Sequence, residues 1–284
     1  TGQRGKVFSS FDVLQDLLCL GFRLRFCRGI GAFRGGDQAA ATFAQCTPIF
    51  QAGCYHGVIQ AYFASLIGST DQGGVGEAAV NALCESYQND LESRWLLFQC
   101  AHGMGHGLTM YYGHHLPRAL AGCDLLRDPW QRESCYSGAF MENVVQATVP
   151  HHTVGRPQAE GESQQHDAHH GHAHGAPPET YKALDPGDPL YPCNTLDERY
   201  LRACYEMQTS AILFFNRGDI PAAARACDGA PEAYRAACYQ SLGRVISAYT
   251  LQNHERAIEL CSSGDLRYRR WCHVGYAKNL VDLT

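Results

Sequence analysis

Apolar residues recur at helical spacing along most of the chain. From residue 41 onward, alanine-rich stretches with an apolar residue every three or four positions alternate with short turns that contain Gly, Asp or Pro. Each unit reads as one helix that ends near a cysteine, a short turn, and a second helix that opens with a cysteine. The pattern predicts six helical hairpins and an all-α fold.

The C-terminal third repeats with a fixed period of 34 residues. Cys193, Cys227 and Cys261 follow this step, and a second series of cysteines and a series of tyrosines keep it too. A hairpin of this length cannot bury its own apolar face and has to stack on its neighbours. We therefore expect disulfide-stapled αα-hairpin repeats that form a solenoid or a curved helical array.

The period and segments such as 218–227 (GDIPAAARAC) resemble tetratricopeptide and Sel1-like repeats. The resemblance covers residues 193 to 284 well and 40 to 145 loosely. The chain departs from this class because it has two cysteines per unit and lacks the Trp, Gly and Pro consensus positions. The resemblance implies an architecture, and at most an interaction role, but it transfers no catalytic residue.

The pattern divides the chain into four parts. Residues 1–40 form an N-terminal helical lead, and residues 41–150 form repeats that carry the candidate histidine site. Residues 151–192 interrupt the repeats with a segment rich in His, Pro and Gly, whose low hydrophobicity predicts a mobile loop. Residues 193–284 form the repeats of 34-residue period.

Fourteen cysteines, an even number with no C-x-x-C spacing, argue against zinc ribbons and thioredoxin chemistry. Disulfides are the natural interpretation, and they place the protein in an oxidising compartment, either secreted or periplasmic. We expect one disulfide per hairpin, and Cys19 with Cys27 is the least secure pairing. The hairpin pairs are Cys46/Cys54, Cys84/Cys100, Cys123/Cys135, Cys193/Cys204, Cys227/Cys238 and Cys261/Cys272.

The charge balance and the missing motifs exclude several classes of function. A net charge of -5 leaves no basic excess for nucleic acid. The most apolar N-terminal run, residues 13–26, is too short and too charged for a transmembrane segment. Because the first residue is Thr1, we expect a mature or trimmed chain. The sequence has no H-E-x-x-H, G-x-S-x-G, Walker A or C-x-x-C-H motif.

The candidate chemistry lies in the stretch Cys100 to Gly107, where His102 and His106 are four residues apart. On a helix such residues lie about 40° apart around the axis, which is metal-ligand spacing. His56 occupies the equivalent point of the preceding repeat, so three imidazoles can converge on copper or zinc. The alternative is that the histidines make ordinary buried hydrogen bonds and the nearby glycines only let helices pack closely.

Further candidates flank this stretch. Glu142 either orients a ligand imidazole, acts as a general base on metal-bound water, or is a simple surface carboxylate. His114, just past the histidine helix, is a weaker candidate ligand. The histidine tract of the insertion is a compositional metal signal, with a solvated linker as the alternative; its members are His166, His169, His170, His172 and His174.

These residues support two hypotheses about function. The first is a metal-binding repeat protein that uses its ion for binding and delivery or for metal-assisted catalysis, as a hydrolase or, with copper, an oxidase. The second is a non-enzymatic scaffold that binds a protein or peptide on the concave face of the solenoid, with structural histidines.

Overall fold

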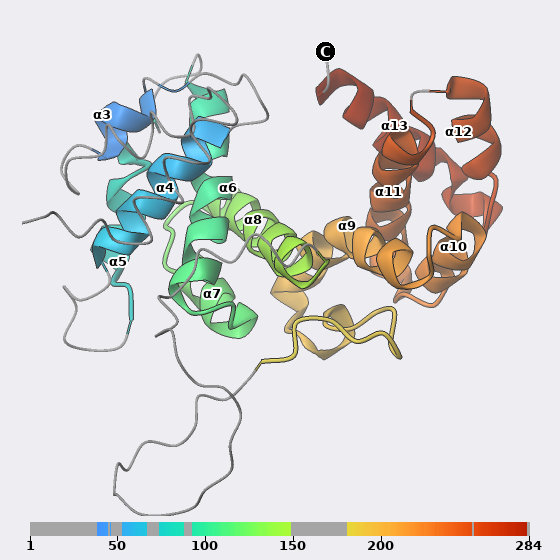
Figure 1. Ribbon diagram of the computed structural model, residues 1–284, viewed down its shortest axis with the longest axis horizontal. Coiled ribbons are helices and arrows are strands. Elements are labelled where there is room, and N and C mark those ends of the chain that lie inside the picture. The colour runs from blue at the N-terminus through green and yellow to red at the C-terminus, as the bar shows by residue number, and fades with distance from the viewer. Residues whose placement is uncertain are drawn as a thin grey trace, which may run out of the picture.

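The computed structural model describes residues 39–44, 46, 53–66, 74–87, 93–148, 181–251 and 253–282. These residues form helices joined by turns, and none of them lies in a strand, so the predicted all-α class is confirmed (Figure 1). The α-helices are α3 (Ala39–Ala44), α4 (Gly53–Leu66), α5 (Glu77–Ala82), α6 (Arg94–Tyr111), α7 (Leu116–Cys123), α8 (Pro129–Thr148), α9 (Glu198–Phe215), α10 (Ile220–Asp228), α11 (Glu232–Tyr249), α12 (His254–Leu260) and α13 (Arg269–Asp282), and the 3₁₀ helices are η2 (Glu85–Tyr87), η4 (Cys193–Thr195) and η5 (Leu266–Tyr268).

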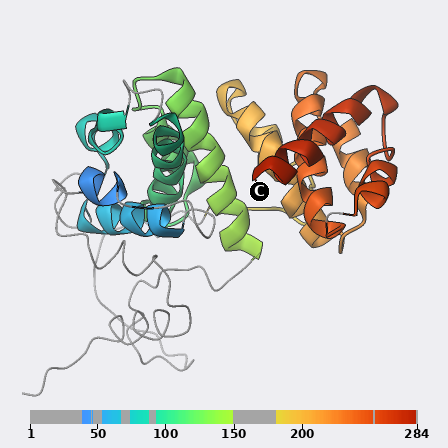
Figure 2. The same cartoon turned by 90° about the horizontal axis from the view of Figure 1, so that it is seen from above.

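The long helices pack in chain order. Helix α4 lies on α6, α6 on α8, α8 on α9, α9 on α11 and α11 on α13 (Figures 1 and 2). The shorter helices α7, α10 and α12 connect successive long ones. This order is what a stacked array of hairpins requires. The superhelical curve of a solenoid stays a prediction.

Side-chain caps fix where the short helices begin. The Asp219 carboxylate accepts a hydrogen bond from the Ala222 N–H at 2.9 Å, and Pro221 lies in the first turn of α10. The Asn253 side chain caps α12 by accepting from the Arg256 N–H. Such caps satisfy N–H groups that the helix itself leaves without acceptors. The hairpins are therefore defined by local sequence as well as by packing.

Five of the expected disulfides are present, and they join the predicted partners: Cys84–Cys100, Cys123–Cys135, Cys193–Cys204, Cys227–Cys238 and Cys261–Cys272. Cys46 is also disulfide-bonded. The side chain of Cys54, and all of Cys19 and Cys27, lie outside the described residues.

In α6, α8, α9 and α11 the second cysteine of the pair does not open the helix, which corrects the sequence-based expectation there, whereas Cys54 is the second residue of α4. Cys100 lies well inside α6, and Cys204 lies well inside α9. Residues before these cysteines extend the helices in the N-terminal direction and bury apolar side chains such as Leu97. In these four helices the disulfide therefore holds the body of the helix rather than its end.

The carboxylate of Asp124 joins the two sides of the insertion. It accepts hydrogen bonds from the hydroxyls of Tyr136, in the same hairpin, and Tyr200, in α9. The two tyrosine rings also meet edge to face at 5.0 Å. One apolar core cluster runs through both halves of the described chain. The halves are therefore packed together although a long insertion separates them in sequence.

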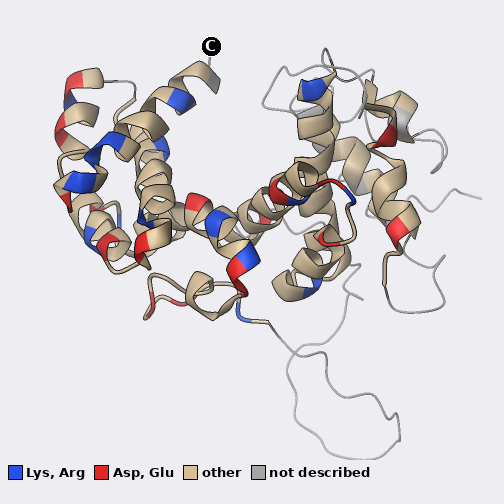
Figure 3. Cartoon of the chain, turned by 180° about the vertical axis from the view of Figure 1, so that it is seen from behind, with Lys and Arg blue, Asp and Glu red and all other residues tan. Residues whose placement is uncertain are grey.

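The described helices carry charged residues of both signs, and none of these helices has the hydropathy of a membrane span. Acidic and basic residues are interspersed over the described helices (Figure 3). In the described ranges, no helix is both long enough and apolar enough to cross a membrane.

Candidate metal site

Helix α6 places His102 and His106 one turn apart in a buried stretch. Their exposed fractions are only 8% and 6%. The two Nε2 atoms are hydrogen-bonded at 3.3 Å, as the alternative interpretation of the sequence expects, and the ring centroids are separated by 5.0 Å at a steep angle. The i, i+4 spacing therefore aims both imidazoles at one point between them.

Glu142 of α8 completes this cluster. Its Oε2 accepts a hydrogen bond from Nδ1–H of His106 at 2.8 Å, and the carboxylate is only 7% exposed. With the proton on Nδ1, the Nε2 atom of His106 is the acceptor in its hydrogen bond with Nε2 of His102. Glu142 is thus a buried partner of His106 and not a helix-surface carboxylate.

The glycines of α6 let its neighbours approach. A Cβ on Gly103 or Gly107 would press on Ile59 or Phe63 of α4. A Cβ on Gly105 would overlap the carbonyl oxygen of Cys135 in α8. Close helix packing therefore explains these glycines, as the alternative interpretation of the sequence holds, and the same packing carries Glu142 to His106.

An aromatic cluster connects His102 to the surface. The Phe98 ring stacks on the His102 imidazole at 5.4 Å, and Trp95 and Trp130 pack on Phe98. The two tryptophans are 51% and 37% exposed, and the Arg94 guanidinium lies over the Trp130 ring. Nothing in the sequence pattern predicted this cluster, although both tryptophans stand five residues before the second cysteine of their pairs.

His114 lies beyond the end of α6, in a turn with φ of 62°. Burial lowers its pKa, and the nearby charge of Glu142 partly offsets this by raising the pKa. Its Nδ1 atom is buried and has no hydrogen-bond partner among the described residues. His114 is therefore a neighbour of Glu142, and no described contact joins it to His102 or His106.

The remaining candidates are not brought together by the described structure. His56 belongs to α4, but its side chain lies outside the described part of the chain. The histidines of the insertion, from His166 to His174, lie in residues that the structure does not describe. Within the described ranges, no group of three or more His, Cys, Asp or Glu side chains is placed to hold a metal ion.

The described ends of the insertion lie near the candidate site. Helix α8 ends at Thr148, six residues after Glu142, and the chain is described again from Tyr181. The Tyr181 ring packs on His115, and the side-chain amide of Asn143 donates to the Ala183 carbonyl at 2.9 Å. Residues 181–192, expected to belong to a mobile loop, therefore pack on the helices in part.

Comparison with known proteins adds no family. No family model matches the chain, and no curated protein or solved structure is significantly similar to it. The resemblance to tetratricopeptide and Sel1-like repeats stays a prediction from the sequence.

Proposed function

We propose that this protein is an extracytoplasmic, disulfide-stapled helical protein that binds a transition-metal ion between His102 and His106. The 3.3 Å separation of their Nε2 atoms carries the proposal. Two nitrogens bonded at about 2.0–2.1 Å to one tetrahedral ion lie about 3.3 Å apart. The separation of the two imidazole nitrogens therefore already suits a shared ion.

Glu142 supports the proposal because metal-binding imidazoles commonly donate their second N–H to a carboxylate. The Oε2 atom of Glu142 accepts from His106 Nδ1–H, and an ion would replace the hydrogen bond between the two Nε2 atoms. Since this oxygen already binds His106, the orienting role is favoured over that of a general base. Binding and delivery of an ion are accordingly favoured over hydrolysis.

The nitrogen separation also bears on the choice of ion. Adjacent nitrogens of a square-planar Cu²⁺ site lie about 2.9 Å apart, and those of a linear site about 4 Å apart. The 3.3 Å between the Nε2 atoms, which is also a hydrogen-bond distance, lies closer to the tetrahedral value, so zinc is the first ion to test. Two protein nitrogens leave two positions for water, another side chain or a delivered ligand.

The other parts of the proposal rest on composition and on disulfides. The histidine tract 166–174 is proposed to raise the local concentration of the ion, since such tracts bind transition metals adaptively. The five described disulfides suit an oxidising, extracytoplasmic compartment.

The test compares four full-length proteins by zinc titration and by elemental analysis after dialysis. In the first variant, asparagine replaces the five tract histidines. The second adds His102→Ala and His106→Ala, and a matched control adds Gln240→Ala and Arg244→Ala instead. We expect the tract variant and the matched control to retain one tightly held zinc ion, and the histidine double variant to lose it.

Glu142→Gln sharpens the test. Glutamine can still accept the hydrogen bond from Nδ1 but lacks the charge, so we expect zinc affinity to fall about tenfold, and further for Glu142→Ala. Cobalt in place of zinc should give the intense visible bands of a tetrahedral site. A tract variant that holds no ion would refute the helical site.

Protein binding is a second candidate function, supported by the exposed cluster of Arg94, Trp95 and Trp130. Tryptophan and arginine dominate the residues that carry affinity in protein interfaces. If the site in α6 held no metal, protein binding would become the favoured function.

A further inference from the structure

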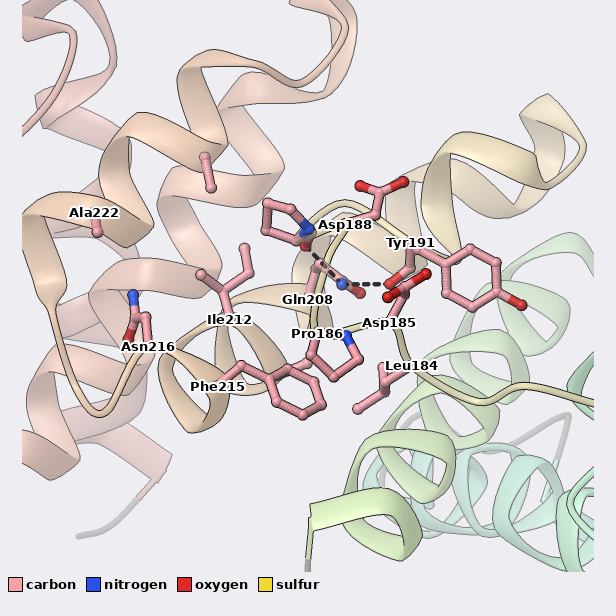
Figure 4. Close-up of a pocket in the computed structure, with 13 residues that line it drawn as sticks. Leu184, Asp185, Pro186, Asp188, Tyr191, Gln208, Ile212, Phe215, Asn216 and Ala222 are labelled. Carbon is pink, nitrogen blue, oxygen red and sulfur yellow. Dashed lines mark hydrogen bonds between the residues drawn. The ribbon is translucent and has the colours of Figure 1, made fainter.

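A cavity of about 260 Å³ lies away from the histidines, between the return of the insertion and helices α9 and α10 (Figure 4). Residues 184–191 form one wall, and α9 forms the opposite one. Alanines of α10, Ala222 and Ala226, close the side and leave space because their side chains are small. The volume suits a molecule somewhat smaller than a typical drug.

Much of the lining is apolar. Leu184, Ile212 and Phe215 face the cavity from its two walls, and two prolines, Pro186 and Pro189, extend this surface (Figure 4). Phe215 is 36% exposed, so its ring reaches from the cavity towards solvent. A ligand with an apolar body would bury this surface.

Gln208 supplies a buried acceptor in the lining. Its Nε2 atom donates to the carbonyls of Pro189 at 2.9 Å and Tyr191 at 2.7 Å, which fixes the orientation of the amide. Its Oε1 atom lies 3.5 Å from Sγ of Cys193. This sulfur belongs to the disulfide with Cys204 and carries no proton, so the carbonyl oxygen retains its capacity to accept.

The charged residues that line the cavity are all acidic. Asp185 and Asp188 contribute carboxylates, and none of the lining residues is Lys, Arg or His. Among the described residues, the Asp188 oxygens accept from two neutral groups, the Leu190 N–H and the Asn194 amide, and each oxygen has a second lone pair. The Asp185 carboxylate forms an ion pair with the Lys182 ammonium. A cationic ligand is therefore preferred to an anionic one.

We propose that this cavity binds a small organic ammonium ion with an apolar body. The apolar part lies against Ile212 and Phe215, and the ammonium group donates to Asp188 and to the Gln208 carbonyl. An ammonium has three donors and no acceptor, which matches a lining that offers acceptors beside an apolar wall. The proposal is independent of the metal site.

The test measures the affinity of three probes of similar size for the full-length protein by calorimetry. The probes are 2-phenylethylamine, which is a cation, 2-phenylethanol, which is neutral, and 3-phenylpropionate, which is an anion. A charge-assisted hydrogen bond should make the amine bind about tenfold more tightly than the alcohol, and the anion should bind most weakly.

Three variants locate the binding. Ala222→Phe fills the cavity from a half-buried helix position and should abolish amine binding, whereas Ala233→Phe at an exposed position of α11 should leave it unchanged. Asp188→Asn should reduce the preference for the amine over the alcohol towards one. Thermal unfolding confirms that each variant is folded.

Several results would overturn the proposal. These are an alcohol that binds as tightly as the amine, an unchanged amine affinity in Ala222→Phe, or no binding of the amine at millimolar concentration. His102→Ala with His106→Ala should leave the amine affinity unaltered. If the double variant lost zinc but kept the amine, the two sites would be separate.

Discussion

Two helix crossings in the molecule share one geometry. In the α6/α8 crossing, a Cβ on Gly105 would overlap the carbonyl oxygen of the second cysteine of the next hairpin, and Gly138 meets the carbonyl of a residue in α6. In the α11/α13 crossing, Gly243 and Gly275 make the same two contacts at the same distances along the chain from their cysteines. The crossing is therefore a structural device that the fold uses twice.

The side chains around the two crossings differ. Counted from the cysteine, His102 and His106 correspond to Gln240 and Arg244, and the glutamate that binds His106 corresponds to Asn279. Arg244 donates to the backbone carbonyl of Glu206 in α9. The glycines therefore allow the close backbone approach in both crossings, whereas the histidine pair occurs in only one of them.

Removing one disulfide from each half should have the largest effect on stability. Cys123→Ala with Cys135→Ala and Cys227→Ala with Cys238→Ala open loops whose sequence separations are 12 and 11. Because loop length sets the entropy gained by the unfolded chain, each should lower the free energy of unfolding by about 3 kcal/mol. Urea denaturation measures the free energy of unfolding of both variants. Losses that differ greatly would mean that the two hairpins are not equivalent.

Substituting the crossing glycines should have an intermediate effect. Gly138→Ala and Gly275→Ala each place a methyl group against a backbone carbonyl that cannot move aside, so each should cost about 2 kcal/mol. Only Gly138→Ala should also weaken zinc binding. Gly76→Ala, at a helix cap with open space around it, is the matched control. Equal losses of zinc affinity in both glycine variants would break the comparison.

Removing a tyrosine hydroxyl should have the smallest effect. Tyr136→Phe removes the donor to Asp124 and should cost about 1 kcal/mol. Tyr239→Phe removes the donor to Asp228 and also the acceptor of the Asp265 N–H, so it should cost more. Thermal unfolding at neutral pH compares the two, and the opposite order would contradict the assigned hydrogen bonds.

The same pair gives a pH dependence. Burial, and then the hydrogen bond to an aspartate, raise the pKa of Tyr136 and of Tyr239 above the ordinary value of 10.0. Because the folded state holds these protons more tightly, the stability that they contribute is present below pH 10 and is lost as the pH rises further. Each Phe variant should therefore lose less stability than the wild type between neutral and alkaline pH.

Periodicity was sufficient to predict much of the fold. The 34-residue step and the spacing of apolar residues identify the hairpins, and proximity along the chain identifies the partners of Cys193, Cys227 and Cys261. The starts of α6, α8, α9 and α11 were placed too late because the cysteine was treated as a boundary. The spacing between cysteines is the same whether a cysteine starts its helix or lies in the middle of it. The start of the helix is therefore set by residues on the N-terminal side of the cysteine, such as Leu97, whose side chain is buried.

The candidate site was only partly predictable. The adjacency of His102 and His106 follows from helix geometry alone. Selecting among the possible roles of Glu142 requires the rotation of α8 on α6, which depends on the close approach at Gly138. The stacking of Phe98 on His102 is set by a side-chain rotamer, and no periodicity reveals it.

Every described disulfide joins two cysteines that follow each other along the chain, at sequence separations between 11 and 16. A polypeptide that emerges from its N-terminus into an oxidising compartment can thus close each covalent link before the next hairpin arrives. None of these cysteines has to wait for a distant partner while later thiols compete for it. If the cysteines pair in the order in which they are synthesised, the described hairpins need little exchange of disulfide partners.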